Sequence, residues 1–331
     1  MGMFSTLVGS RLPPRYQRLF KLPPRVESWK VRDTADTVLG RAVREWFAEH
    51  DAPAAVYRLD SGRDALGARI GLIERARRTV DIQSYLIKDD LSGNLVALHL
   101  AEAADRGIRV RLLMDDALTD EVDPGLLSLD EHENIEVRVF NPFPRRRSRF
   151  ISLLDKFNIL NRRIHNKSFT VDNQVTIVGG RNLADEYYQT GGEAEFIDED
   201  LLAIGPPVDE ISDGFDDYWN SPEAIPMGAF KRLVPHGSVT ESIREARRLL
   251  DKHIDDPFLK GVDGRLVDDL IGGRLDLTGA NVEVVQDLPE KVRNPLKRGP
   301  SATVEYLQKM VSAADNELIV ISPYFVPQKQ G

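Results

Sequence analysis

The 331-residue sequence contains no cysteine, which excludes disulfide bonds and thiolate metal sites and is typical of a cytoplasmic protein. No apolar run reaches the ~18 residues that a transmembrane helix requires. The opening also lacks the basic-then-apolar order of a signal peptide. A hydrophobic content of 41% still provides for a proper core, and the length allows one large domain or two ordinary ones. We therefore expect a cytoplasmic protein that does not span a membrane.

Basic residues are fewer than acidic ones, 44 against 53. The resulting formal net charge of −9 at pH 7 makes nucleic acid an unlikely partner. The first 32 residues differ from this average. They contain one acid, Glu27, and these basic residues: Arg11, Arg15, Arg18, Lys21, Arg25, Lys30 and Arg32. Interleaved apolar side chains make this basic arm either a contact with an anionic membrane surface or a solvated segment. The first alternative predicts a peripheral protein at the inner membrane.

Segments typical of strands and helices alternate from residue 37 to residue 140. Strands are expected at residues 54–59, 80–87, 108–114 and 135–140. Helices are expected at residues 37–50, 93–105 and 124–132, and another follows a capping box at Ser61 and Asp64. This alternation predicts a layered α/β domain.

A stretch from His165 to Asn182 gathers an imidazole, an ammonium, a carboxylate and a carboxamide. Residues 167–171 and 175–178 are expected to form two strands of a hairpin. Alternation along the first strand places His165 and Lys167 on one face and Asp172 on the other, where it shapes the turn. Gly179-Gly180 then allows the backbone to approach a ligand closely and lets Asn182 turn back toward it.

A protonated lysine and a carboxamide donor beside a histidine suit a phosphate ester, because they bind its oxygens while the imidazole attacks phosphorus. The alternative is a buried histidine that lies near a surface lysine by chance. The complete spacing His-x-Lys-x4-Asp-x6-Gly-Gly-x-Asn, from His165 to Asn182, favours the functional interpretation.

This spacing resembles the signature of the phospholipase D superfamily, and its Gly-Gly-x-Asn form is similar to that of one type of bacterial cardiolipin synthase. Residues 103–113, Asp115-Asp116 and residues 140–143 are also similar to the synthase pattern. The resemblance implies a phospholipase D-like layered α/β/α domain with a mixed sheet. The opening strand-helix-strand of a second similar domain is expected to follow.

The resemblance also implies a metal-free, cofactor-free mechanism through a phosphohistidine. His165 would act as nucleophile or general acid, while Lys167 and Asn182 would bind phosphate. Asp198, on a strand expected from residue 196, would orient His165, although it is alternatively an exposed acid in an acidic stretch. The implied catalytic set is His165, Lys167, Asp172, Asn182 and Asp198.

A cluster of arginines between residues 144 and 166 immediately precedes the motif. It either holds lipid phosphates or forms a solvated charge run. Asp115 and Asp116 are expected to have a structural role or to line the rim of the site. The expected substrate-binding set is Lys167, Asn182, Arg163, Arg162 and Tyr85.

The chain begins to repeat itself from residue 281, with a strand at 281–287, a helix containing Val304, Leu307 and Val311, and a strand at 317–324. His165 is the only histidine followed by lysine two residues later. The predicted domains are a basic N-terminal arm and helix (1–50), a first catalytic domain (51–220), a linker or insertion (221–280) and an incomplete second domain (281–331).

The resemblance implies a phosphatidyltransferase of cardiolipin synthase type, acting on phosphatidylglycerol or a similar phospholipid. One alternative is a phospholipase D or another hydrolytic phosphodiesterase. Another is a catalytically silent half-enzyme that binds anionic lipid. Because one imidazole cannot be both nucleophile and leaving-group acid in one step, the chain needs a missing second half or a homodimer to be active.

Overall fold

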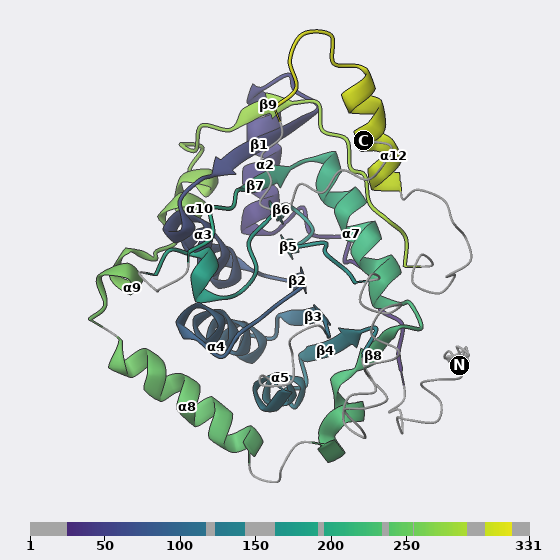
Figure 1. Cartoon of the computed structure of the whole chain (residues 1–331). Coiled ribbons are helices and arrows are strands. Elements are labelled where there is room, and N and C mark those ends of the chain that lie inside the picture. Colours follow the sequence, from purple (N-terminus) through teal and green to yellow (C-terminus); the bar gives the residue numbers. More distant parts are fainter. Residues whose placement is uncertain are drawn as a thin grey trace, which may run out of the picture. The chain divides into compact units, whose positions relative to one another are not determined.

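The computed structural model describes residues 25–116, 123–142, 163–190, 195–233, 238–253, 255–289 and 302–319. The chain divides into two compact units, residues 1–284 and residues 285–331 (Figure 1). Most of the basic arm and Arg162 lie outside the described residues, as do the arginines at positions 145, 146, 147 and 149.

The first unit is built on a mixed sheet, in which nine strands are described, in the order β8-β4-β3-β2-β5-β6-β7-β1-β9. The pairs β2–β3 and β3–β4 are parallel and the remaining neighbours are antiparallel. The strands are β1 (Ala54–Leu59), β2 (Thr79–Ser84), β3 (Arg109–Asp115), β4 (Ile135–Phe140), β5 (Ser168–Val171), β6 (Val175–Gly179), β7 (Asp200–Ile204), β8 (Ala224–Pro226) and β9 (Thr278–Ala280).

The strands are joined and covered by helices. The helices of this unit are α2 (Val38–Glu49), α3 (Gly62–Arg75), α4 (Leu91–Asp105), α5 (Asp123–Asp130), α7 (Pro206–Trp219), α8 (Ser238–Lys252), α9 (Pro257–Gly261) and α10 (Arg265–Ile271), with the 3-10 helices η1 (Asp185–Tyr187) and η2 (Met227–Leu233). The Ser61 hydroxyl caps α3 by accepting a hydrogen bond from the Asp64 amide at 3.3 Å, as the sequence predicted.

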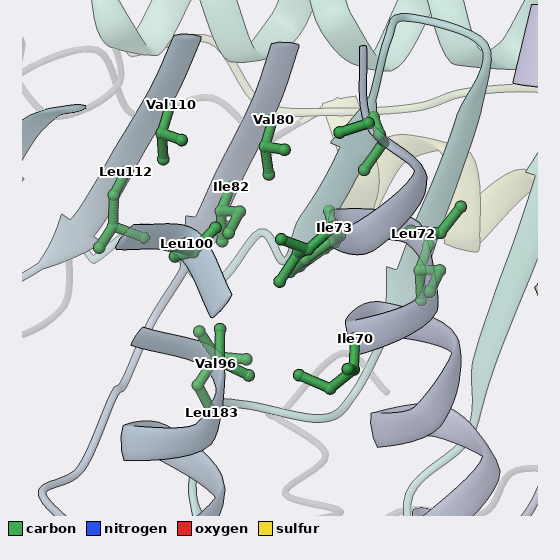
Figure 2. Close-up of a cluster of buried hydrophobic side chains, with 14 of the residues drawn as sticks. Ile70, Leu72, Ile73, Val80, Ile82, Val96, Leu100, Val110, Leu112 and Leu183 are labelled. Carbon is green, nitrogen blue, oxygen red and sulfur yellow. The ribbon is translucent and has the colours of Figure 1, made fainter. Parts of the chain in front are cut away.

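Helices lie on both faces of the sheet. Figure 2 shows Ile82 of β2 and Leu112 of β3 beside Leu100 of α4, and all three are almost fully buried. Arg111 has the opposite parity on β3, and its guanidinium carbon lies 4.8 Å from the ring centroid of Phe215 on α7. Because neighbouring β3 residues contact α4 and α7, the expected layered α/β/α arrangement is confirmed.

Residues 221–280, predicted to be a linker or insertion, contribute to the first unit's architecture. They contain α8, α9 and α10, and their strands β8 and β9 form the two edges of the sheet. Residue 284 marks the end of the compact unit to which they belong.

The second unit contains the predicted helix, α12 (Ala302–Ser312). The strand expected at residues 281–287 was wrong, since residues 281–288 form no strand. An apolar extended segment becomes a strand only where a neighbour supplies hydrogen bonds, and none of the described strands pairs with it. Residues 317–319 are likewise non-strand, and residues 320–324 lie outside the described part.

No helix among the described residues has the length and apolar character needed to cross a membrane.

Candidate active site

His165 and Lys167 contact each other just before β5. The Lys167 Nζ lies 3.3 Å from His165 Nδ1 and donates a hydrogen bond to the His165 carbonyl oxygen at 3.0 Å. Tyr85, directly after β2, packs against both: its ring centroid is 5.2 Å from that of His165 and 5.8 Å from Lys167 Nζ. The predicted pairing of imidazole and ammonium is present, although the regular strand begins only at Ser168.

Asp172 lies at the opposite end of β5 from Lys167, in the turn that leads into β6. Both Asp172 and Asn173 have left-handed φ values, 52° and 50°, in the three-residue turn between the paired residues Val171 and Val175. The buried Asp172 carboxylate accepts hydrogen bonds from the amides of Arg78 at 2.7 Å and Thr79 at 3.0 Å. It therefore ties the hairpin to the connection between α3 and β2.

The double glycine after β6 makes room for two carboxylates. A Cβ on Gly179 would lie 2.1 Å from Asp200 Oδ1, and one on Gly180 would lie 2.1 Å from Asp198 Oδ1. The sequence predicts that these glycines admit a ligand, whereas the space beside them is taken by Asp200 at the start of β7 and by Asp198 just before it. Any side chain at either position would displace a carboxylate.

The two carboxylates have different surroundings. Asp200 is buried and accepts hydrogen bonds from Arg69 Nη2 at 2.8 Å and from the Arg181 amide at 3.2 Å. Asp198 precedes β7 and is half-buried, and its charge raises the pKa values of both His165 and Lys167. Asp198 is therefore the better candidate for an electrostatic partner of the histidine, whereas Asp200 is committed to the core.

Asn182 is buried, and its Oδ1 has no hydrogen-bond partner among the described residues. The next residue fixes its place, because the Leu183 amide donates to the Leu86 carbonyl at 3.1 Å and the Leu183 carbonyl accepts from the Lys88 amide at 3.0 Å. These two hydrogen bonds hold Asn182 beside the loop that follows β2, which also contains Tyr85.

Arg163 and Ile164 are held by one carboxylate, that of Asp115 at the carboxyl end of β3. Arg163 Nη1 donates to Asp115 Oδ1 at 3.0 Å, and the Ile164 amide donates to Oδ2 at 3.0 Å. Burial raises the pKa of Asp115 to about 7, although the Arg163 charge opposes the shift. The structural role expected for Asp115 agrees with these contacts. The sequence did not predict that Asp115 binds Arg163 and Ile164, the residues next to His165. The one feature in the sequence that points to this role is an acidic residue at the end of a buried strand.

Burial controls the charge state of the central pair. It lowers the pKa of Lys167 to about 8, against the opposing charges of Asp198 and Asp200. It also lowers the pKa of His165, and the Lys167 charge lowers it further. At neutral pH the site therefore combines an uncharged imidazole with a lysine that is still mostly protonated. This is the state in which an imidazole is nucleophilic and a lysine attracts an anion.

Within the described ranges, no cluster of three or more histidine or acidic side chains has the geometry of a metal site.

The family model described as the phospholipase D-like domain of cardiolipin synthase matches residues 70–219. This range contains β2 to β7 and every residue of the site from Tyr85 to Asp198. Residues 70–219 of the chain are therefore similar to a phospholipase D-like domain.

Among curated proteins, the chain is 37% identical over 294 residues to cardiolipin synthase C of Escherichia coli K12, covering 88% of this chain and 62% of that protein. It is 30% identical over 305 residues to an uncharacterized protein of Helicobacter pylori J99, covering 90% and 59%. The chain thus spans about three fifths of the length of these relatives.

Among solved structures, NucT from Helicobacter pylori matches with a TM-score of 0.40 and 16% identity, covering 52% of this chain and 98% of that one. Phosphatidylserine synthase of Haemophilus influenzae matches with a TM-score of 0.41 and 13% identity, covering 66% and 48%.

Proposed function

We propose that this site transfers a phosphatidyl group between phospholipids, in the manner of a cardiolipin synthase. The observation that carries the proposal is the contact between a neutral imidazole and a buried ammonium, with Asn182 and Asp198 beside the neighbouring strands β6 and β7. Similarity to cardiolipin synthase C along 88% of the chain supports a phospholipid as the substrate.

In the proposed first step, an imidazole nitrogen attacks phosphorus of the donor lipid. The nitrogen–phosphorus bond forms, the bond from phosphorus to the glycerol headgroup oxygen breaks, and that oxygen takes up a proton. Lys167 and the Asn182 carboxamide would hold the phosphate oxygens and stabilise their charge in the transition state. A hydroxyl of a second lipid then attacks phosphorus and passes its proton to the group that protonated the first leaving oxygen. The nitrogen–phosphorus bond breaks, which frees the imidazole and gives cardiolipin when both lipids are phosphatidylglycerol.

The contact between Lys167 and His165 bears on which nitrogen reacts. An ammonium can only donate, so His165 Nδ1 accepts and the ring proton lies on Nε2 when Lys167 is charged. Attack through Nε2 requires that proton to move to Nδ1. In our proposal, a bound phosphate draws Lys167 away from Nδ1, and Asp198 stabilises the new tautomer and the positive charge that develops. Without that shift, the proton on Nε2 prevents attack through that nitrogen.

The proposed chemistry needs a second group that protonates the leaving alcohol while the histidine attacks. We propose that a second His-x-Lys motif supplies it, either on a longer form of the chain or on a second copy paired about a two-fold axis. The basic arm would hold the protein peripherally on the anionic cytoplasmic face of the inner membrane, where the substrate lies.

The test is headgroup exchange with phosphatidylglycerol vesicles, with the lipid products separated by chromatography. Cardiolipin formation that is lost in His165→Ala, but kept in a control with the exposed Lys231 changed to alanine, would support the transferase. Phosphatidic acid without cardiolipin would identify a hydrolase instead. No product from a chain that light scattering shows to be monomeric would indicate a silent lipid-binding half.

A further inference from the structure

A cavity of about 270 Å³ lies between α4, α5 and α8, outside the site described above. The three helices enclose it because their facing positions carry small side chains. On α4, Gly93, Ala97 and Ala101 follow one another at four-residue spacing and share one face, while Ala246 faces the cavity from α8. The volume is near the lower end of small-molecule pockets, about 300 Å³.

Much of the cavity wall is apolar. Leu98 of α4 and Leu126 and Leu129 of α5 line it together with the alanines. Its wall also includes Ser128, which is only 9% exposed and whose hydroxyl has no hydrogen-bond partner among the described residues. A buried hydroxyl without a partner is costly, so the wall has an unused donor for an occupant's oxygen atom.

Part of the cavity wall comes from the loop that follows β2. Ile87 and Lys88 of this loop line the cavity, and Ile87 forms an isolated β-bridge with Leu183, the residue after Asn182. Lys88 Nζ also pairs with Glu186 Oε1 at 2.5 Å. Lys88, Asp89 and Asn94 are polar lining residues in this part of the cavity, and Asp105, His132 and Arg247 line it elsewhere.

We propose that this cavity binds one acyl chain of the phospholipid whose phosphate occupies the site. The inference rests on the proposed function. An ester-linked chain matches the lining, because its carbonyl oxygen would accept from Ser128 while its methylenes fill the space that the small residues leave. Chain burial would then fix the donor lipid's phosphorus relative to His165.

The test uses phosphatidylglycerol with a photoreactive diazirine on its palmitoyl chain, carried in phosphatidylcholine vesicles, and maps the labelled peptides by mass spectrometry. We expect label on α4 and α5. The cavity-filling variant Ala97→Phe should lower that label about tenfold or more, because each methylene kept out of the cavity costs roughly fourfold in affinity. The matched control is Glu102→Phe, which places the same ring on the exposed side of α4.

Thermal unfolding verifies that each variant is folded, and the milder Ala101→Leu replaces Ala97→Phe if the larger ring prevents folding. Equal labelling of filled and control variants, or label confined to other segments, would overturn the acyl-chain site. Labelling does not require turnover. A chain that takes the label on α4 and α5 but makes no cardiolipin would therefore refute only the proposed function, and cardiolipin synthesis without this label would refute only the cavity's role.

Discussion

Two buried cations, Arg111 and Lys167, show how differently the same fold treats positive charge. Arg111 donates to both oxygens of Asp81, at 2.7 and 2.8 Å, and also pairs with Asp216 at 2.8 Å. Burial lowers its pKa, but these carboxylates outweigh burial, so the net shift is upward. Lys167 has no ion pair within 4.0 Å among the described residues, and burial lowers its pKa to about 8.

The difference separates a structural charge from a functional one. Arg111 is neutralised by its neighbours and lies between α7 and the sheet, so it has nothing left to offer a ligand. Lys167 is only partly compensated, by the more distant charges of Asp198 and Asp200. A buried cation that is only partly compensated is stabilised most when a ligand supplies the missing negative charge.

The largest expected effect is on the structural charge. Arg111→Ala removes the cation that contacts both Asp81 and Asp216 and leaves only the more distant Arg109, 3.6 Å from Asp81, so we expect a loss of about 3–5 kcal/mol in the free energy of unfolding. Urea denaturation measures it. The control is Arg274→Ala, which removes an exposed ion pair with Asp269 and should cost about 0–1 kcal/mol. Equal losses for the two variants would contradict the assignment of Arg111.

Lys167→Met should show the reverse pattern. We expect a fall in kcat of about 10²–10³-fold, since one charged donor to the transition state is lost. The free energy of unfolding should stay constant or rise, because an undercompensated buried cation is removed. Turnover of phosphatidylglycerol and urea denaturation on the same preparations measure the two quantities. A large loss of stability would make Lys167 a structural residue like Arg111.

Asp115→Asn should have an intermediate effect. The substitution keeps one oxygen for the Ile164 amide but loses the charge that holds Arg163, so the segment carrying His165 is less firmly placed. We expect about a tenfold fall in kcat, or roughly 1.4 kcal/mol in the barrier, with KM little changed. An unchanged kcat would show that Asp115 does not position the histidine.

The smallest effect is a pH dependence specific to Lys167. Its pKa is depressed in the folded state, to about 8 from an ordinary 10.5. The unfolded chain therefore binds more protons between these values, so the lysine's contribution to stability rises with pH across this window. Binding of phosphatidylglycerol should fall across the same window as the ammonium is lost.

The Lys167→Met variant is the reference for both curves, since it lacks the titrating group. Asp198→Asn should move the binding curve to lower pH, because Asp198 raises the Lys167 pKa. A binding curve that does not move would remove Asp198 from the electrostatics of the site.

Local patterns predicted most of this fold, because alternation and capping are encoded within a few residues. The helix cap at Ser61, the hairpin turn at Asp172 and the pairing of His165 with Lys167 all follow from such short-range signals. Contacts between segments far apart in the sequence could not be predicted in this way. Nothing near residue 281 in the sequence indicates that the strand forms at β9 instead, since that depends on an available edge at β1.

The candidate site divides in the same way. The motif could be recognised in the sequence. Which side chains lie beside Gly179 and Gly180 could not be predicted, because it depends on the pairing of β7, about twenty residues later in the chain. The hydrogen bonds from Arg163 and Ile164 to Asp115 join residues about fifty positions apart in the sequence. Such contacts are set by strand order, which a single sequence specifies only weakly.

The hairpin β5–β6 lies in the middle of the strand order, with β2 on one side and β7 on the other. Amide hydrogens in the centre of a sheet exchange with solvent only when the whole unit opens, so β5 and β6 belong to the last part of the unit to unravel. The motif residues therefore lie on or next to the strands of the first unit that unfold last. Loss of activity on heating should coincide with global melting, and partial opening of the edges at β8 or β9 should leave the motif intact.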